Sequence, residues 1–474
     1  MSSPQSTGSY RRTALIVAAA LFMQNLDATV LATALPTMAR EFAVPPAEMS
    51  LALTGYLLAL AVFIPASGPV ADRFGGRRTF QAAIGLFVGG SVLCGFAPTL
   101  SALVAARFVQ GIGGAMMVPV GRLVLLRSVE KHELVAAMAW LTMPAMIGPI
   151  IGPPVGGAIV TLLDWHWIFW INVPTGLVGM LMVGRHISDE GIATPRPFDR
   201  LGFLLCALTL APLIFGLQLA GRSTHIGLAL ALLCGGLVAL AAYLVHARRT
   251  AHPLLDITLL RIATFRLSIL GGGLIRVTQG AMPFLMPMLL QFAFGLSAAA
   301  SGGVTLATAL GSFTMKGVAR RVLRRFGFRA TLAMAGVLLP LTYALAGFIG
   351  PDWPLPAIFG LLAACGFLAS LLFTAYNTIA YADVSPECMS RATSFYATFQ
   401  QLSLSLGICA GASMLGLAMR TYGHTLPEFS DFRSAIWAVC AVSLLALIPN
   451  LALPRDAGAE LSGHRKARGG VSEE

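Results

Sequence analysis

The chain has 474 residues, of which 57% are hydrophobic and only 11% are charged, and its mean hydropathy is +0.79. Soluble domains carry about 25% charged residues, so this composition excludes a water-soluble globular fold. The formal net charge is +12. The basic residues lie in short loops between apolar runs rather than on one continuous face, so the charge indicates membrane topology and not nucleic-acid binding.

Apolar runs of about 20 residues recur along the whole chain, and each is long enough to cross a hydrocarbon core of about 30 Å. The first run continues into the membrane pattern without a cleavage-like site, so we expect no removable signal peptide. The pattern predicts an all-α polytopic membrane protein that contacts the lipid bilayer through fourteen transmembrane helices. These are 13–35, 50–70, 79–97, 101–126, 134–163, 167–184, 201–219, 226–245, 267–290, 298–315, 330–349, 355–381, 392–419 and 435–453.

Loop charges predict the orientation of these spans. An even number of spans places both termini on one side, and cytoplasmic loops are enriched in lysine and arginine. Basic clusters at 73–78 and 320–329 fall on the side of the termini. We therefore expect a multi-pass protein of the inner (plasma) membrane with both termini in the cytoplasm. Four arginines fall on the other side: Arg40, Arg222, Arg420 and Arg433.

An internal repeat relates the two halves of the chain. The sequence RFGGR at 73–77 is echoed by RFGFR at 325–329, an offset of 252 residues. The repeat predicts two six-helix bundles joined by a linker that contains two further transmembrane helices. Paired bundles are typical of alternating-access carriers, whose substrate site lies near the midplane. The predicted boundaries are a tail at 1–12, bundles at 13–184 and 266–453, the linker at 185–265 and a tail at 454–474.

Ionisable groups in a bilayer are costly, so each one inside a span is a candidate functional residue. Asp27 is the one acidic residue placed well inside a span, and Arg107 lies at a similar depth in the fourth span. Burial disfavours a charged carboxylate whereas a nearby guanidinium favours it, and this balance can let Asp27 bind and release protons near neutral pH. The alternative is a permanently ionised pair that only holds the two helices together.

A second polar group lies in the ninth span. Arg276 stands near its midplane, and Gln279 occupies the position that the repeat makes equivalent to Asp27. A guanidinium facing a cavity favours an anionic or carboxylate-bearing solute. The alternative is an arginine that hydrogen-bonds a neighbouring helix. The predicted substrate-cavity residues are Arg276, Gln279, Asn377, Gln400 and Gln401, since polar side chains are disfavoured against lipid.

The fifth span carries an unusual density of glycine and proline in the sequence GPIIGPPVGG at 148–157. In a membrane this predicts a kinked helix with a bare face for close packing, which serves as a hinge, as a seal against ion leak or for helix packing alone. The residues concerned are Gly148, Pro149, Gly152, Pro153, Gly156 and Gly157. The sequence QGIGG at 110–114 likewise permits close approach of another helix.

These motifs resemble those of the major facilitator superfamily, and specifically its fourteen-helix drug/proton antiporter branch. The loop at 68–78 matches the superfamily's first signature, Arg107 with 110–114 the proton-coupling signature, and 148–157 the antiporter signature. The sequences LDATV at 26–30 and WHWIFWINVP at 165–174 look like markers of the branch, and the stretch 115–122, with the placement of Arg276, looks most like MdtD-type multidrug transporters.

The resemblance implies a major facilitator fold, proton coupling through Asp27 and Arg107, and a cytoplasmic gate. The gate residues would be Gly68, Asp72, Arg73, Gly75, Arg77 and Arg78. The second half departs from this pattern, because Arg324 stands where the repeat would place an equivalent of Asp72. The gate is therefore expected to be asymmetric.

The leading hypothesis is proton-coupled export of small organic compounds, with the substrate and protons as the partners. A rival is efflux of an organic anion or a metal chelate such as iron-citrate, and proton-coupled uptake is less favoured by the antiporter signature. The sequence shows no nucleophile, paired acids or metal cluster within the spans and no nucleotide-binding loop, so we expect neither an enzyme nor a cofactor nor a metal site. The seven cysteines are scattered without metal or disulfide spacing.

Overall fold

The computed structural model describes residues 8–127, 134–187, 198–220, 226–251, 253–350, 353–385 and 388–462. Residues 1–7 and 463–474 of the two predicted tails, and Arg222 among the outer arginines, lie outside this part. The first half contains α1 (Gly8–Glu41), η1 (Pro46–Met49), α2 (Ser50–Phe74), α3 (Gly76–Gly95), α4 (Leu100–Arg127), α5 (Leu134–Leu162), α6 (Trp167–Trp170) and α7 (Asn172–His186).

The remaining helices follow in chain order. The pair α8 (Arg200–Ala220) and α9 (Ile226–Arg249) is followed by η4 (Ile257–Arg261), α10 (Ala263–Met288), the π-helical turn η5 (Leu289–Ala293) and α11 (Ala298–Ala346). The chain ends in α12 (Leu355–Ile379), α13 (Met389–Tyr422), α14 (Phe429–Leu444), α15 (Leu447–Ala452) and α16 (Ala459–Ser462).

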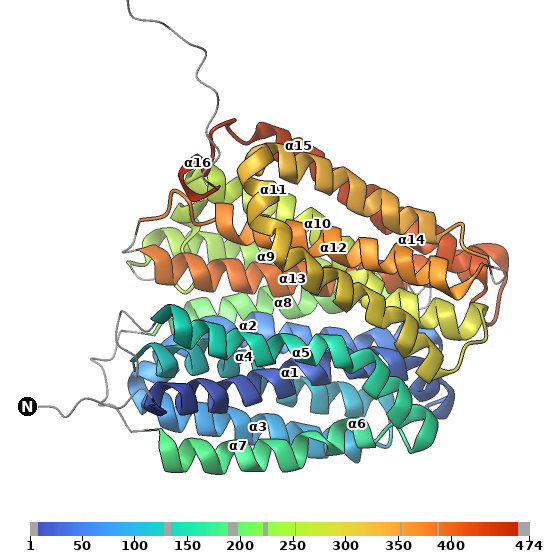
Figure 1. Cartoon of the computed structure of the whole chain (residues 1–474), viewed down its shortest axis with the longest axis horizontal. Helices are drawn as coiled ribbons and strands as arrows, with labels where there is room; N and C mark the ends of the chain where they lie inside the picture. The colour runs from blue at the N-terminus through green and yellow to red at the C-terminus, as the bar shows by residue number, and fades with distance from the viewer. Residues whose placement is uncertain are drawn as a thin grey trace, which may run out of the picture.

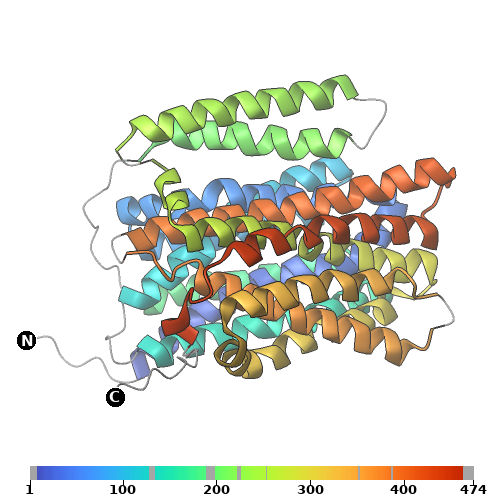
Figure 2. The same ribbon diagram turned by 90° about the horizontal axis from the view of Figure 1, so that it is seen from above.

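All fourteen predicted spans fall on helices, because α11 contains two of them and α6 with α7 forms one. In the described part, ten helices are long and apolar enough to cross a membrane. Figure 1 shows α1 to α7 on one side of the molecule and α10 to α15 on the other. In Figure 2, α8 and α9 form a hairpin set apart along one edge. The protein is thus an all-α polytopic membrane protein.

The repeat seen in the sequence is also present in the backbone. Gly75, between α2 and α3, has φ 88° and ψ 143°, and Gly327, within α11, has φ 71° and ψ 172°. Both are first glycines of the RFG sequences, 252 residues apart, and a positive φ is readily adopted only by glycine. Gly327 therefore breaks α11 into the two predicted spans, as Gly75 separates α2 from α3.

The arginines of the repeat also match. Arg73 lies over the ring of Phe74 at 5.7 Å, and Arg325 lies over the ring of Phe326 at 5.5 Å. These stacked pairs occupy the same place in each half, beside the glycine that turns the chain.

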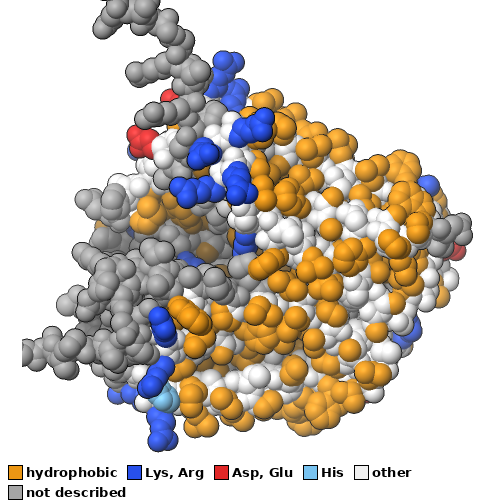
Figure 3. Space-filling model, in the orientation of Figure 1, with side chains coloured by type: hydrophobic (Ala, Val, Ile, Leu, Met, Phe, Trp, Pro, Cys, Tyr) orange, Lys and Arg blue, Asp and Glu red, His pale blue; other side chains and the backbone are white. Residues whose placement is uncertain are grey.

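The outer surface suits a lipid environment. Hydrophobic side chains cover the middle of the face in Figure 3, whereas most lysines and arginines in view gather toward the end where α1 begins. Helix α9 buries few residues, and Val238 on it is 70% exposed. Because water-exposed apolar area on this scale is unfavourable, these side chains are placed to face acyl chains.

Candidate functional site

A fully buried ion pair lies inside the first half. Asp27 on α1 and Arg107 on α4, which the sequence places at similar depths, are 2.5 Å apart, with side chains 0% and 1% exposed. Taking two charges out of water is costly, so such a pair is retained only where further hydrogen bonds satisfy both groups. The Arg107 guanidinium also lies 4.4 Å from the ring centroid of Tyr56 on α2.

Amide side chains from α4 itself and from α7 complete this centre. Asp27 accepts a hydrogen bond from Gln110 Nε2 at 2.9 Å and from Asn172 Nδ2 at 2.7 Å. Gln110 also accepts from Arg107 at 2.6 Å and donates to Ser91 Oγ on α3 at 2.8 Å. We call Asp27, Arg107, Gln110, Asn172 and Ser91 the charge centre. Helices α1, α2, α3, α4 and α7 contribute to it or contact it.

Glycines allow these helices to approach closely enough for the charge centre to form. A Cβ at Gly90 on α3 would lie 2.5 Å from Gln110 Cα, and one at Gly113 on α4 would lie 2.5 Å from Phe87 N. A Cβ at Gly111 would meet Tyr56 O at 2.7 Å. Side chains at these positions would push α2 and α3 away from α4, so the predicted close packing of 110–114 is present.

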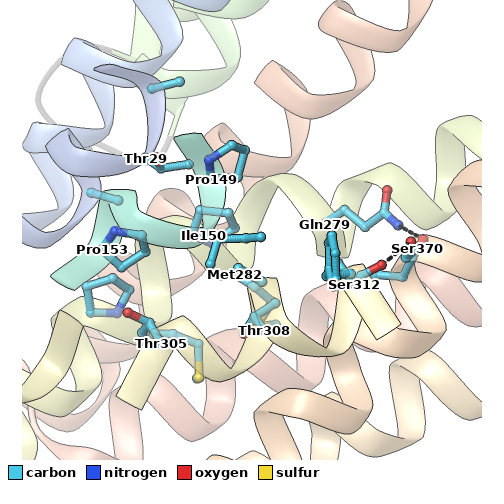
Figure 4. A pocket seen from close by; sticks show the side chains of 18 of the residues that line it. Thr29, Pro149, Ile150, Pro153, Gln279, Met282, Thr305, Thr308, Ser312 and Ser370 are labelled. Carbon is cyan, nitrogen blue, oxygen red and sulfur yellow. Dashed lines mark hydrogen bonds between the residues drawn. The ribbon is translucent and has the colours of Figure 1, made fainter. Parts of the chain in front are cut away.

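A cavity of about 560 Å³ lies between the two halves. Figure 4 shows Thr29 on α1 and Pro149, Ile150 and Pro153 on α5 on one side of it. The opposite wall comes from α10, α11 and α12. It includes Gln279, Met282, Met286, Thr305, Thr308, Ser312, Phe313, Lys316, Ser370 and Phe373. The wall is mostly apolar with a few polar groups, as ligand cavities usually are.

The charge centre and this cavity are separate. Asp27 does not line the cavity, although its neighbours Ala28 and Thr29 do. The carboxylate of Asp27 therefore faces the interior of the first half, while a different face of α1, which carries Ala28 and Thr29, lines the space between the halves.

Only one of the five predicted cavity residues lines the cavity. Gln279 does so, and its Nε2 donates to Ala369 O at 3.2 Å. Arg276 is 3% exposed and donates to Tyr396 Oη at 3.0 Å, and it lies over that ring at 5.2 Å. Its immediate contact in this conformation is thus with a neighbouring helix. The other three are partly exposed and also lie outside the cavity lining: Asn377, Gln400 and Gln401.

The glycines of α5 form two packing faces. A Cβ at Gly148 would lie 3.0 Å from Leu26 N on α1, and Cβ atoms at Gly152 and Gly156 would collide with Thr29 and Thr33 on the same helix. This spacing of four residues places all three on one face.

The other α5 face meets the second half. A Cβ at Gly157 would collide with Ala298 O on α11, and one at Gly302 on α11 would collide with Pro153 O. Thr161 Oγ1 accepts from Ala299 N at 3.2 Å. We call this contact between 153–161 and 298–302 the α5–α11 seal. It closes the space between the halves at the end away from the start of α1.

The second closure at this end involves η5. Gln291 is buried and its Nε2 donates to Thr33 O at 2.9 Å, and Arg40 lies over the ring of Phe292 at 5.6 Å. Both contacts link the end of α1 to the second half, so that end of the cavity is closed by backbone and side chains together.

The predicted gate residues surround the turn between α2 and α3. Gly68 and Arg73 are exposed, Asp72 is half-buried, and Arg77 donates to Gly184 O at the end of α7. Arg78 is exposed as well. The loop is thus tied to α7 at the end of the molecule where α1 begins.

Sequence reasoning missed three participants. Ser91 gave no signal, since a single serine in an apolar helix is ordinary. Asn172 stood in the recognised marker at 165–174 without an assigned role. Lys316 lines the cavity but directly follows Met315, where the predicted span ended.

Comparison with known proteins identifies the family. The profile described as Major Facilitator Superfamily matches residues 17–408 and 269–471. Two relatives bearing the name multidrug resistance protein MdtD resemble the chain over nearly its full length. The protein of Serratia proteamaculans is 37% identical, covering 93% of this chain and 92% of its own, and that of Klebsiella pneumoniae strain 342 is 38% identical, covering 96% and 97%.

Solved structures share the fold at low identity. The human organic anion transporter MFSD10 has a TM-score of 0.62 at 16% identity, covering 95% of this chain and 100% of its own. The POT family transporter PepTSo has a TM-score of 0.70 at 13% identity, covering 96% and 99%. The chain therefore belongs to the major facilitator superfamily and is a membrane transporter rather than an enzyme.

Proposed function

We propose that this transporter is a proton-coupled antiporter that exports small organic compounds by alternating access. The observation that carries the proposal is the buried charge centre. It lies on one face of α1, and another face of the same helix lines the apolar cavity between the halves. Helix α1 contributes to both, so a change of charge at Asp27 acts on the helix that lines the cavity.

Asp27 is the proposed proton carrier. Protonation removes its charge, yet Arg107 then keeps the Gln110 carbonyl at 2.6 Å and the Tyr56 ring. The guanidinium thus has partners in both protonation states, which avoids leaving an uncompensated buried charge. The loss of the ion pair weakens the link between α1 and α4, and α1 is free to shift against α5.

The contacts that close the two ends of the cavity are the basis of the proposed alternating access. We infer that the two halves rock as bundles, with boundaries at 13–184 and 266–453, and that α8 and α9 accompany them as a linker pair. The α5–α11 seal closes the outer end in this conformation, and the loop with Gly68, Asp72, Arg73, Gly75, Arg77 and Arg78 gates the cytoplasmic end. The termini are cytoplasmic in this proposal, because the basic side chains gather at their end.

The exported compound occupies the cavity in this proposal. Gln279 contacts it directly, since it lines the wall. Arg276, Asn377, Gln400 and Gln401 make no contact with substrate in this conformation.

The test is transport by purified protein in liposomes. Two probes with the same apolar body are used, pyrenebutyrate and pyrenebutyl-trimethylammonium. For each probe, transport is measured in the direction opposite to the proton flow that an imposed pH gradient drives. Asp27→Asn is expected to lose gradient-driven export and to keep gradient-free counterflow, because the amide keeps the shape and cannot carry a proton. The matched control Asp164→Asn changes an exposed loop carboxylate and should behave as wild type.

Gradient-driven export at the wild-type rate in Asp27→Asn would contradict the carrier role. The ion pair would then serve only to hold α1 to α4.

A further inference from the structure

Prolines in two helices of the cavity wall remove backbone hydrogen bonds. Pro153 lies within α5, and Pro283 and Pro287 lie within α10. Proline has no N–H, so the carbonyl four residues earlier in the helix loses its usual donor. The three carbonyls concerned belong to Pro149, Gln279 and Pro283.

These three carbonyls lie on the cavity side of their helices. Residues four apart share one helix face, and both members of each pair line the cavity: Pro149 with Pro153, Gln279 with Pro283, and Pro283 with Pro287. Figure 4 shows Pro149 and Pro153 on the α5 wall and Gln279 on the wall of the second half. A carbonyl without a donor is costly in a membrane and is tolerated where it is buried in protein or lines a cavity.

The hydroxyls on the same wall point their hydrogens away from the cavity. Those of Thr29, Thr33 and Thr305 donate to carbonyls of their own helices. Ser312 and Ser370 donate across the contact between α11 and α12. A hydroxyl has one hydrogen, so in this conformation each of these side chains offers a ligand only its lone pairs.

The three carbonyls and these hydroxyls therefore form a wall of hydrogen-bond acceptors, with contributions from both halves. An N–H or O–H group of a ligand gives up its hydrogen bonds to water when it enters an apolar cavity. It loses affinity unless it finds an acceptor there. An ether or a quaternary ammonium group has no such hydrogen and gains nothing from these acceptors.

We propose that the cavity selects apolar compounds that carry N–H or O–H donors, with protonated primary amines as the class that offers the most donors. This inference rests on the proposed function, in which this cavity holds the exported compound. The donor group bonds the carbonyls of Gln279 and Pro283 and the hydroxyl oxygens, while the apolar body packs on Met282, Met286 and Phe373.

Equilibrium binding in nanodiscs of zwitterionic lipid tests the proposal without a pH gradient. One pair of probes is pyrenebutylammonium and pyrenebutyl-trimethylammonium, which share the charge and the apolar body and differ in their N–H donors. A second pair, pyrenebutanol and its methyl ether, makes the same comparison without charge. Because the members of each pair have equal charge, the ammonium of Lys316, which also lines the cavity, does not enter the comparison.

Pro283→Ala restores an N–H that can pair with the Gln279 carbonyl, so one acceptor is lost from the wall. We expect this variant to bind pyrenebutylammonium roughly tenfold more weakly and the trimethylammonium probe as wild type does. The matched control is Pro212→Ala, because Pro212 lies inside α8 and does not line the cavity. It should leave both affinities at their wild-type values.

A second variant removes an acceptor without touching the backbone. Thr305→Val keeps the shape of the side chain, and we expect it to weaken pyrenebutanol roughly two- to tenfold and to spare the ether. Its control on the same helix is Thr342→Val, since Thr342 makes the same kind of bond, to Leu338 O, on an exposed face outside the cavity lining.

The decisive quantity is the ratio of affinities within each pair, because the hydration of each probe is the same for wild type and variant. Ratios that stay unchanged in both Pro283→Ala and Thr305→Val would overturn the proposal. Equal weakening of both members of a pair would also overturn it, since the variant would then act through the shape of the cavity.

These outcomes differ from a failure of proton coupling. Asp27→Asn should keep the wild-type ratios even where it loses gradient-driven export, because Asp27 does not line the cavity. Donor-dependent binding without gradient-driven export in the wild type would leave this proposal standing and would remove the proposed antiport.

Discussion

At the scale of single residues, the charge centre depends on how many donors surround one carboxylate. Asp27 receives hydrogen bonds from Arg107, Gln110 and Asn172, which come from two helices and meet it from different directions. The carboxylate is thus satisfied without water. Of the three donors, only Arg107 brings a charge, so it is the one partner whose loss would leave the buried carboxylate without a counter-charge.

Substitution of Arg107 separates the charge from the shape of this centre. We expect Arg107→Ala to shift the pH dependence of transport, because Asp27 loses its cation and keeps only two amide donors. Arg107→Lys should retain part of the wild-type profile, since it keeps the charge but not the planar guanidinium that bonds Gln110 and stacks on Tyr56. The measurement is the initial export rate in liposomes across a pH series.

If both variants gave the wild-type pH profile, the arginine would have no part in coupling. Gel filtration and thermal unfolding of each variant serve as the control, since truncation of a buried ion-pair partner costs on the order of 3–5 kcal/mol.

Single residues also show which aspects of a side chain's position can be predicted from the sequence and which cannot. Depth along a helix is readable, because each residue adds about 1.5 Å, and so Asp27 and Arg107 were expected at one level. Rotation about the helix axis is not readable from a helix that is apolar all round. Arg276 was therefore expected in the cavity, whereas it stacks on Tyr396. Lys316 was missed because a lysine is taken to end an apolar run.

At the scale of elements, α5 is shaped by what it touches on two sides. Its glycines at a spacing of four fit against α1, and Gly157 with Pro153 fits against α11. Small residues let backbones approach, which is the main way helices pack in a membrane. The sequence predicted a bare face on α5. It did not show that α11 contributes Gly302 to the same contact, because that partner is about 150 residues away in the chain.

Adjacent glycines on α11 provide a test of the seal. A Cβ at Gly302 would collide with Pro153 O, whereas one at Gly303 would find open space. Overpacking a close contact costs about 1–3 kcal/mol, so Gly302→Leu should lower the population of the sealed state roughly tenfold or more. We expect slow export and leak of the pH gradient from Gly302→Leu liposomes and wild-type behaviour from Gly303→Leu. Equal behaviour of the two variants would remove the α5–α11 contact from the transport cycle.

At the scale of the whole molecule, most of the architecture was predictable. The apolar runs between basic loops predicted the positions of the long helices, although not the short η1, η4 and α16, and the RFG repeat marked Gly75 and Gly327 as the equivalent turns. The relation between the halves was not predictable, because it depends on contacts such as Gln291 with Thr33, which join residues 258 apart. Those contacts determine which end of the cavity is closed.

The closed end leads to the final prediction, which concerns access to the cavity. Phe313 lines the cavity and is 55% exposed, while the α5–α11 seal and the Gln291 hydrogen bond close the end away from the start of α1. In a background with the two less buried cysteines, Cys234 and Cys388, replaced by serine, Phe313→Cys should react with a membrane-impermeant maleimide added on the side of the termini. In vesicles of the opposite orientation, the thiol at position 313 should not react with the maleimide. The remaining five cysteines are buried and give the low background that the comparison needs.

Reaction from the opposite side alone would mean that the α5–α11 seal is open in the resting state of the protein. It would reverse the assignment of the inner and outer ends of the cavity. Reaction from neither side would place Phe313 against lipid, because a maleimide needs water to reach the thiolate.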